Sequence, residues 1–223
     1  MDESFLRQEF WYRAHWIAPE ADLAEADLAC ADLNTTNLFG ANLSGADLGG
    51  ANLATSDLSG ADLLLADLAG LNGVAAWFVC ADLQGADLGL ANLMGAKLDG
   101  GCFVGADLGG ANLAAASLPG ANLAEVNLLG ANLYCSNLEG AILRQAKSAG
   151  ANYWSTDLRW ADLTGANLRG ANFCKADMRE VILSGADLYG AYLWETDLTG
   201  AVADQETCWP YGFDREAAGV VFK

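Results

Sequence analysis

The sequence predicts an all-β solenoid in which the chain winds into stacked square coils. A repeat of five residues runs from Ala21 to Gly200 without losing register. Leu occupies 29 of the 36 positions spaced five apart from 23 to 198, and Ala stands two places earlier in 27 units. Asp or Asn precedes the Leu position in 28 units, and Gly most often ends the unit.

A period of five matches neither a helix nor a continuous strand. Five residues of α-helix turn by about 500°, so the Leu positions would spread around the whole surface. In a strand, positions five apart point to opposite faces. The chain must therefore turn once per unit, and four turns of about 90° close a square of twenty residues.

In the square coil, each position of the five-residue unit points inward, points outward or lies at a corner. Leu and Ala point inward, the Asp or Asn between them points outward and bonds backbone at the corner, and Gly suits the corner itself. Coils stack at about 4.8 Å, so the 36 units from 21 to 200 make about nine coils and a rod of about 43 Å.

Units such as Ala41-Asn42-Leu43-Ser44-Gly45 and Ala161-Asp162-Leu163-Thr164-Gly165 resemble those of the pentapeptide-repeat family. The resemblance covers 180 of the 223 residues and follows the Ala-(Asp/Asn)-Leu-X-X form found in photosynthetic bacteria. It implies a right-handed quadrilateral β-helix.

Both ends of a solenoid need caps. We predict a capping helix within residues 1–20, because positions 4–17 carry one apolar stripe with Asp2 and Glu3 near its start. The stripe consists of Leu6, Phe10, Ala14 and Ile17. Residues 201–223 break the period and resemble a closing segment common in pentapeptide-repeat proteins of photosynthetic bacteria, with Trp209 and Phe213 as the expected plugs.

Two inward positions depart from the pattern. Gly73 leaves a Leu position empty, but Leu71 stands where Ala is expected, so the volume is nearly kept and the register should hold. Ser148 has no such compensation, because Ala146 is small. We expect a looser coil there or a buried hydroxyl bonded to backbone.

Composition limits the function. With 29 acidic and 11 basic residues the net charge is −18, which argues against direct nucleic-acid binding. A single His and no CxxC pair among six Cys argue against a catalytic triad or a metal site. No signal peptide, membrane span or nucleotide-binding motif is found, so we expect a cytoplasmic protein with reduced thiols, no enzymatic activity and no cofactor.

Residues twenty apart should form columns on the surface. One begins with Asp27, Asp47, Asp67, Asp87 and Asp107, which we interpret as corner-capping carboxylates, with a weak divalent-cation strip as the alternative. The next column holds seven successive Asn from 52 to 172, which predict an amide ladder.

Aromatic and basic residues gather late in the repeat, where we predict an interaction surface. Tyr134, Trp154, Cys174 and Trp194 share an outward column, with Trp160 and Tyr192 nearby. Five bases should surround them on the same coils, and Arg and aromatics are enriched in protein interfaces. These bases are Arg144, Arg159, Arg169, Lys175 and Arg179.

Two functions are compatible with the sequence. The first is a non-catalytic rod that binds an unidentified protein partner or a second copy of itself. The second is suggested by the resemblance, because some members of the family mimic duplex DNA and bind gyrase. The repeat has 21 acids and 7 bases. About 43 Å of duplex carries about 25 charges, so the rod imitates DNA poorly.

Overall fold

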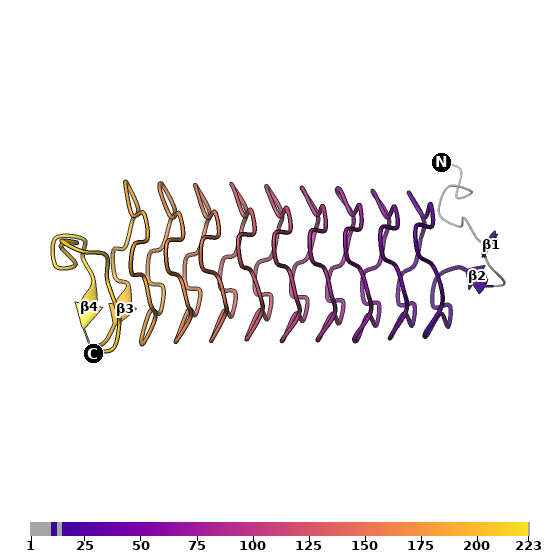
Figure 1. Ribbon diagram of the computed structural model, residues 1–223, viewed down its shortest axis with the longest axis horizontal. Helices are drawn as coiled ribbons and strands as arrows, with labels where there is room; N and C mark the ends of the chain where they lie inside the picture. Colours follow the sequence, from indigo (N-terminus) through magenta and orange to yellow (C-terminus); the bar gives the residue numbers. More distant parts are fainter. Residues whose placement is uncertain (1–9, 13–14, 223) are drawn as a thin grey trace.

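The computed structural model describes residues 10–12 and 15–222, which form a long rod of stacked coils (Figure 1). Each outward residue pairs in parallel with the residue twenty places later, from Asp22 with Asn42 to Ile182 with Val202. Each coil has four sides. In the first coil these are residues 21–25 (side 1), 26–30 (side 2), 31–35 (side 3) and 36–40 (side 4), and each side recurs every twenty residues.

Backbone hydrogen bonds explain why one unit makes one side. Leu43 N–H donates to the Asp62 carbonyl of the next coil at 2.7 Å, and Asn42 N–H donates to Ala21 of the coil before at 2.9 Å. Ala46 N–H donates to Leu43 at 3.0 Å and closes a β-turn. The third residue of this turn, Gly45, has φ +65°, as a type II turn requires.

The bore of the rod is an apolar core. Inward Leu and Ala side chains from 23 to 198 are almost all fully buried. Outward carboxylates and amides hold the turns instead, as Asp67 does when its Oδ1 accepts the Ala69 N–H at 2.9 Å. The expected division between inward Leu and Ala and outward Asp and Asn is observed.

The corner that ends side 3 is built differently from the other three. Only Gly95 occupies it with glycine, whereas residues such as Thr55 adopt positive φ there. The next residue is often Ser or Thr, and in three of the described coils its hydroxyl donates to a carbonyl of the preceding coil. Examples are Ser56 Oγ to Leu33 O at 2.6 Å and Thr156 Oγ1 to Leu133 O at 2.7 Å. These bonds tie neighbouring coils together where the backbone is strained.

The two irregular core positions have different outcomes. Around Gly73 the register holds, and a Cβ placed there would lie 3.0 Å from Leu71 Cδ1, so Leu71 fills the space as predicted. The expectation of a backbone partner for Ser148 is wrong. Its hydroxyl lies 2.7 Å from the Tyr153 hydroxyl, and both side chains are fully buried. Tyr153 reaches across the bore and supplies the bulk that Ser148 lacks.

The predicted N-terminal helix is not confirmed, and no helix occurs in the described residues. Strand β1 (Phe10–Tyr12) instead pairs antiparallel with β2 (His15–Ile17). Aromatic and branched residues favour strands over short helices. The rest of the predicted helix, residues 4–9 and 13–14, lies outside the described residues.

At the other end, β3 (Val202–Ala203) pairs in parallel with β4 (Val221–Phe222). One extra residue enters the last coil, because Asp187 pairs with Cys208 rather than with residue 207. The Asp204 carboxylate accepts the backbone N–H of Gly185 at 3.0 Å and thereby closes this bulge.

The two expected plugs also lie at this end. Trp209 and Phe213 stack at 5.2 Å and pack on the end of the core. They cover the end of the bore as predicted.

Candidate functional site

The aromatic column, which we define as Tyr134, Trp154, Cys174 and Trp194, lies on side 3 of successive coils. The Asn two places earlier holds the backbone beneath each of the first three, as when Asn152 Oδ1 accepts the Trp154 N–H at 3.2 Å. Tyr134 is 47% exposed and Trp194 58%, while Trp154 is half-buried. Large rings are therefore presented to solvent from a rigid surface.

An amide ladder runs beside this column. Asn132 and Asn152 are joined by an Nδ2-to-Oδ1 bond of 3.0 Å, and Asn152 and Asn172 by one of 3.2 Å. Tyr192 follows Asn172 in the same column and is exposed. The ladder holds successive coils at a fixed spacing, so the aromatic side chains above it start from fixed positions.

Lys175 is the base that contacts the aromatic column. Its Nζ lies 5.9 Å from the Trp154 ring centroid and 5.2 Å from that of Trp194. Both distances are typical of cation–π contacts. Cys174 lies between the two tryptophans and is only 9% exposed. Lys175 Nζ is also 3.8 Å from Glu195 Oε2.

Two further bases lie around the corner on side 4, in an alternating row of charges. Arg159 contacts Asp157 at 2.6 Å, Glu139 at 2.8 Å and Asp177 at 3.7 Å. Arg179 contacts Asp177 at 2.6 Å. The hydrogen bond from Arg179 lowers the pKa of the Asp177 carboxyl, with the charge of Arg159 adding to the effect. Arg159 also lies 5.1 Å from the ring of Trp160, which is exposed at the corner between sides 4 and 1.

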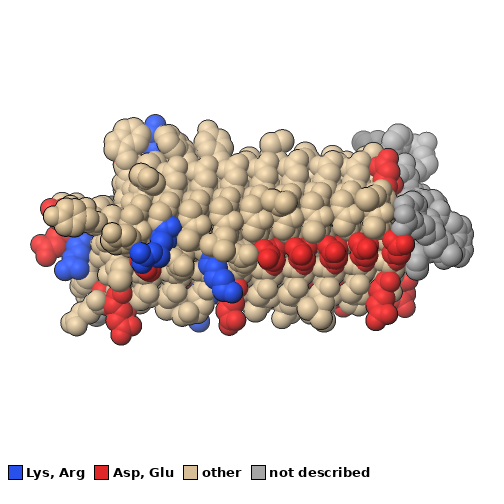
Figure 2. Space-filling view, viewed as in Figure 1, with Lys and Arg blue, Asp and Glu red and all other residues tan. Residues whose placement is uncertain are grey.

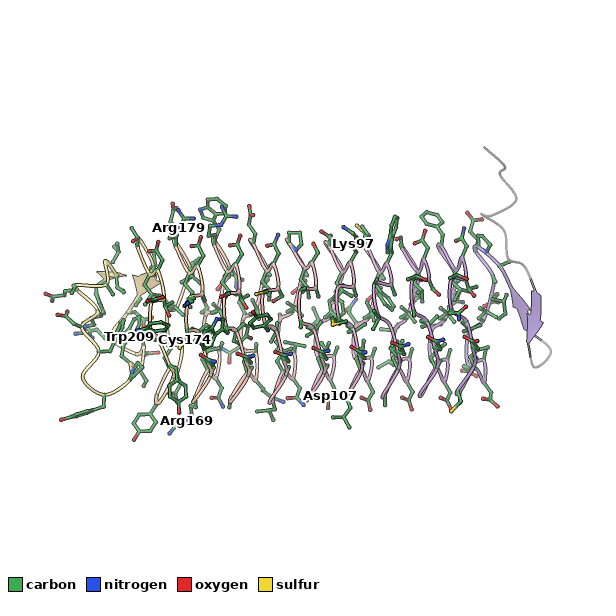
Figure 3. All side chains as sticks on the ribbon, turned by 90° about the horizontal axis from the view of Figure 1, so that it is seen from above. Lys97, Asp107, Arg169, Cys174, Arg179 and Trp209 are labelled. Carbon is green, nitrogen blue, oxygen red and sulfur yellow. The ribbon has the colours of Figure 1, made fainter. Side chains whose placement is uncertain are left out.

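The remaining two bases lie on other sides. Arg144 on side 1 pairs with Asp162 at 2.6 Å. Arg169 on side 2 pairs with Asp187 at 2.8 Å and lies over the Tyr189 ring at 4.8 Å. Figure 3 labels Arg169 and Arg179 on opposite edges of the rod. The structure thus brings only Lys175 of the five bases to the aromatic column.

These bases leave no positive patch on sides 3 and 4. There the last coils carry six carboxylates and three bases, a net charge of −3, and each base is paired with a carboxylate. The residues are those of 131–140, 151–160, 171–180 and 191–200. Counting bases along the sequence does not reveal that they lie on different sides. The remainder of each residue number after division by twenty, the length of one coil, assigns each base to its side.

The repeat is also recognised by comparison with known sequences. The profile of pentapeptide repeats matches in eight copies, over residues 19–54, 81–110, 106–145, 149–179, 156–194 and 182–204. The chain belongs to the pentapeptide-repeat family. Its fold is accordingly the right-handed quadrilateral β-helix of that family. No curated protein sequence matches the chain.

Solved structures similar to this pentapeptide-repeat protein come from several sources. HetL from Nostoc sp. strain PCC 7120, involved in heterocyst differentiation regulation, is 34% identical over 82% of this chain and 81% of its own, with a TM-score of 0.46. A thylakoid-lumen protein of Arabidopsis thaliana is 36% identical over 46% and 68%, with a TM-score of 0.41. QnrB1, a plasmid-mediated fluoroquinolone resistance protein, is 22% identical over 74% and 83%, with a TM-score of 0.54.

A second surface feature of this pentapeptide-repeat protein is the acidic row on side 2. Five exposed carboxylates form a continuous line along the rod (Figure 2), and the next two residues in the same column are Asn127 and Lys147. Asn127 Nδ2 donates to Asp107 Oδ1 at 2.8 Å and so ends the run of like charges. The row consists of Asp27, Asp47, Asp67, Asp87 and Asp107.

The acidic and thiol side chains of the described residues do not gather into a candidate metal site. Within residues 10–12 and 15–222, no group of three or more His, Cys, Asp and Glu side chains could hold a metal ion. His15 lies in β2 at the first end of the rod. Among the same residues, none form a helix that could cross a bilayer.

Proposed function

We propose that this pentapeptide-repeat protein is a rigid, non-catalytic rod that binds a partner protein through the aromatic column. The observation that carries the proposal is the alignment of Tyr134, Trp154 and Trp194 in one outward column of side 3, beside a hydrogen-bonded amide ladder. Exposed aromatic groups in a row invite association. Such rings bind at low entropic cost, because the rigid backbone beneath them is already ordered.

The partner is a different protein or a second copy of the chain meeting along side 3 with two-fold symmetry. We also propose that the rod works in the cytoplasm, since all six cysteines are free thiols.

The test replaces Trp154 and Trp194 with Ser and compares the result with Trp77→Ser, a matched exposed tryptophan on side 4. The folded state should survive in both variants, because none of these side chains enters the bore. The double variant should lose self-association in ultracentrifugation or lose partners captured from host extract, and Trp77→Ser should lose neither. Retention of both properties in the double variant would contradict the proposal.

The acidic row supports a second candidate, a DNA mimic that binds a DNA-dependent enzyme such as gyrase. Its carboxylates are exposed and evenly spaced, but Asn127 and Lys147 end the row. We expect no inhibition of supercoiling at protein concentrations comparable to that of gyrase. Strong inhibition that weakens when Asp47, Asp67 and Asp87 become Asn would favour this candidate over the aromatic column.

A further inference from the structure

We propose that the aromatic column receives a Lys- or Arg-bearing segment of the partner, at the place that Lys175 now occupies. This inference rests on the proposed function and specifies the chemistry of the partner. Five bases around the column would by themselves favour an acidic partner, but the structure brings only Lys175 to the column.

The first support is the position of the Lys175 ammonium between two indoles. Trp154 and Trp194 are two coils apart, about 9.6 Å along the rod. The residue between them is Cys174, whose small side chain leaves the space above it to Lys175. The faces of indole rings carry negative potential and attract cations. The structure therefore already holds a cation in this site, supplied by the chain itself.

The second support is the charge around the site. Sides 3 and 4 of the last coils have a net charge of −3, and the bases Arg159 and Arg179 are held by carboxylates. One of the carboxylates in this count, that of Glu195, lies 3.8 Å from the Lys175 ammonium. An acidic partner would meet repulsion from the net negative charge of these sides, whereas a cationic segment would be attracted both by that charge and by the indole faces.

Lys175 is consequently a competitor for the site rather than a contact to the partner. A cationic segment must displace its ammonium from the two indoles before it can bind there. Replacing Lys175 with Gln removes this competitor and one positive charge. Binding of a cationic segment should then strengthen, whereas binding of an acidic segment should weaken, so the sign of the change identifies the partner.

The experiment is an NMR titration of the full chain labelled with ¹⁵N, following the indole N–H signals. The probe is a hexapeptide of alternating glycine and lysine, compared with the same peptide carrying glutamate. We expect the lysine peptide to shift the Trp154 and Trp194 signals far more than the Trp77 signal. Lys175→Gln should lower Kd about two- to fivefold, the range expected for one exposed cation–π contact.

The matched control is Lys97→Gln. Lys97 pairs in the sheet with Trp77 on side 4, so its replacement removes the same charge beside a different tryptophan. A gain in affinity shared by both variants would reflect only net charge and would overturn the proposal. Shifts produced by the glutamate peptide instead, or a loss of affinity in Lys175→Gln, would overturn it as well.

The failure of this inference is distinguishable from failure of the proposed function. If Trp154→Ser with Trp194→Ser loses the native partner or the dimer while Lys175→Gln binds the lysine peptide no better than Lys97→Gln, the column is an interface for another chemistry. If the double tryptophan variant keeps every partner and its oligomeric state, the interface itself is rejected.

Discussion

The buried hydroxyl pair in the bore makes a measurable prediction about stability. Tyr153→Phe leaves the Ser148 hydroxyl buried without its 2.7 Å partner. An unsatisfied buried hydroxyl costs about 1–3 kcal/mol, and we expect a loss of that size in the free energy of unfolding. Adding Ser148→Ala removes the orphaned group, so the double variant should be more stable than the sum of the two single losses predicts.

The loss of stability at alkaline pH is a second test of the same hydroxyl pair. Burial raises the pKa of the Tyr153 hydroxyl from 10.0 to about 12, although its hydrogen bond with Ser148 acts in the other direction. The folded protein keeps this proton between pH 10 and 12, while the unfolded chain loses it. The contribution of this proton to the free energy of unfolding is therefore fully present below pH 10. It falls by about 3 kcal/mol as the pH rises from 10 through 12.

Urea unfolding followed by circular dichroism at pH 8, 10 and 11.5 would measure both effects. Tyr153→Phe should be less stable than wild type at pH 8 but should lose less stability on going to pH 11.5. Other tyrosines titrate in both proteins and cancel in the comparison. Strict additivity in the double variant, together with the same alkaline loss in Tyr153→Phe, would refute the role assigned to the pair.

Three other predictions concern the core, the acidic row and the corners. Leu88→Ala should lower the free energy of unfolding by about 2–5 kcal/mol, and Leu88→Asp should unfold the central coils, as thermal unfolding would show. Asp67→Asn should raise stability by about 1 kcal/mol at low salt, and calcium should stabilise the wild type no more than sodium at equal ionic strength. Gly85→Ala places a Cβ 2.7 Å from Leu65 Cδ2, but Leu65 is 68% exposed and can turn away, so the excess cost over Gly60→Ala, which meets open space, should be small. Both also bear about 1 kcal/mol for positive φ, and adding Leu65→Ala should remove the excess at position 85.

Much of the fold follows from sequence because every unit obeys the same local rule. The repeat alone predicts that Leu71 fills the gap left by Gly73, since both positions belong to one unit. The partner of Ser148 was missed because Tyr153 belongs to the next side of the coil and reaches it across the bore. Contacts across the bore depend on side-chain length and direction, which a repeat pattern does not contain.

The first end of the rod was harder to predict for a different reason. An apolar stripe through Phe10 and Ile17 fits a short helix, yet residues 10–12 and 15–17 pair as strands. Over so few residues, helical and strand periodicities cannot be separated, and aromatic residues favour the strand. Outside the repeat, a prediction of secondary structure depends on the helix and strand propensities of a few residues.

The candidate site was predictable in part. The aromatic residues could be aligned by number alone, because Trp154 and Trp194 differ by a multiple of twenty. The bases were grouped by proximity along the chain, which puts Arg144 and Arg169 on sides that do not carry the column. The ion pairs of Arg159 and Arg179 with neighbouring carboxylates depend on side-chain distances, which the sequence does not contain.

The rod has a repeat of five residues and a coil of twenty residues. Its interior and its surface therefore tolerate inherited insertions and deletions of different lengths. Removing one unit of five residues between Trp154 and Trp194 would still offer Leu and Ala to the bore, so folding selection would barely detect it. The same deletion would rotate everything downstream by a quarter turn and carry Trp194 onto a neighbouring side. Only changes of twenty residues preserve both interior and exterior. Selection for stability therefore does not keep the two tryptophans on the same side of the coil. Only selection for binding would maintain their spacing.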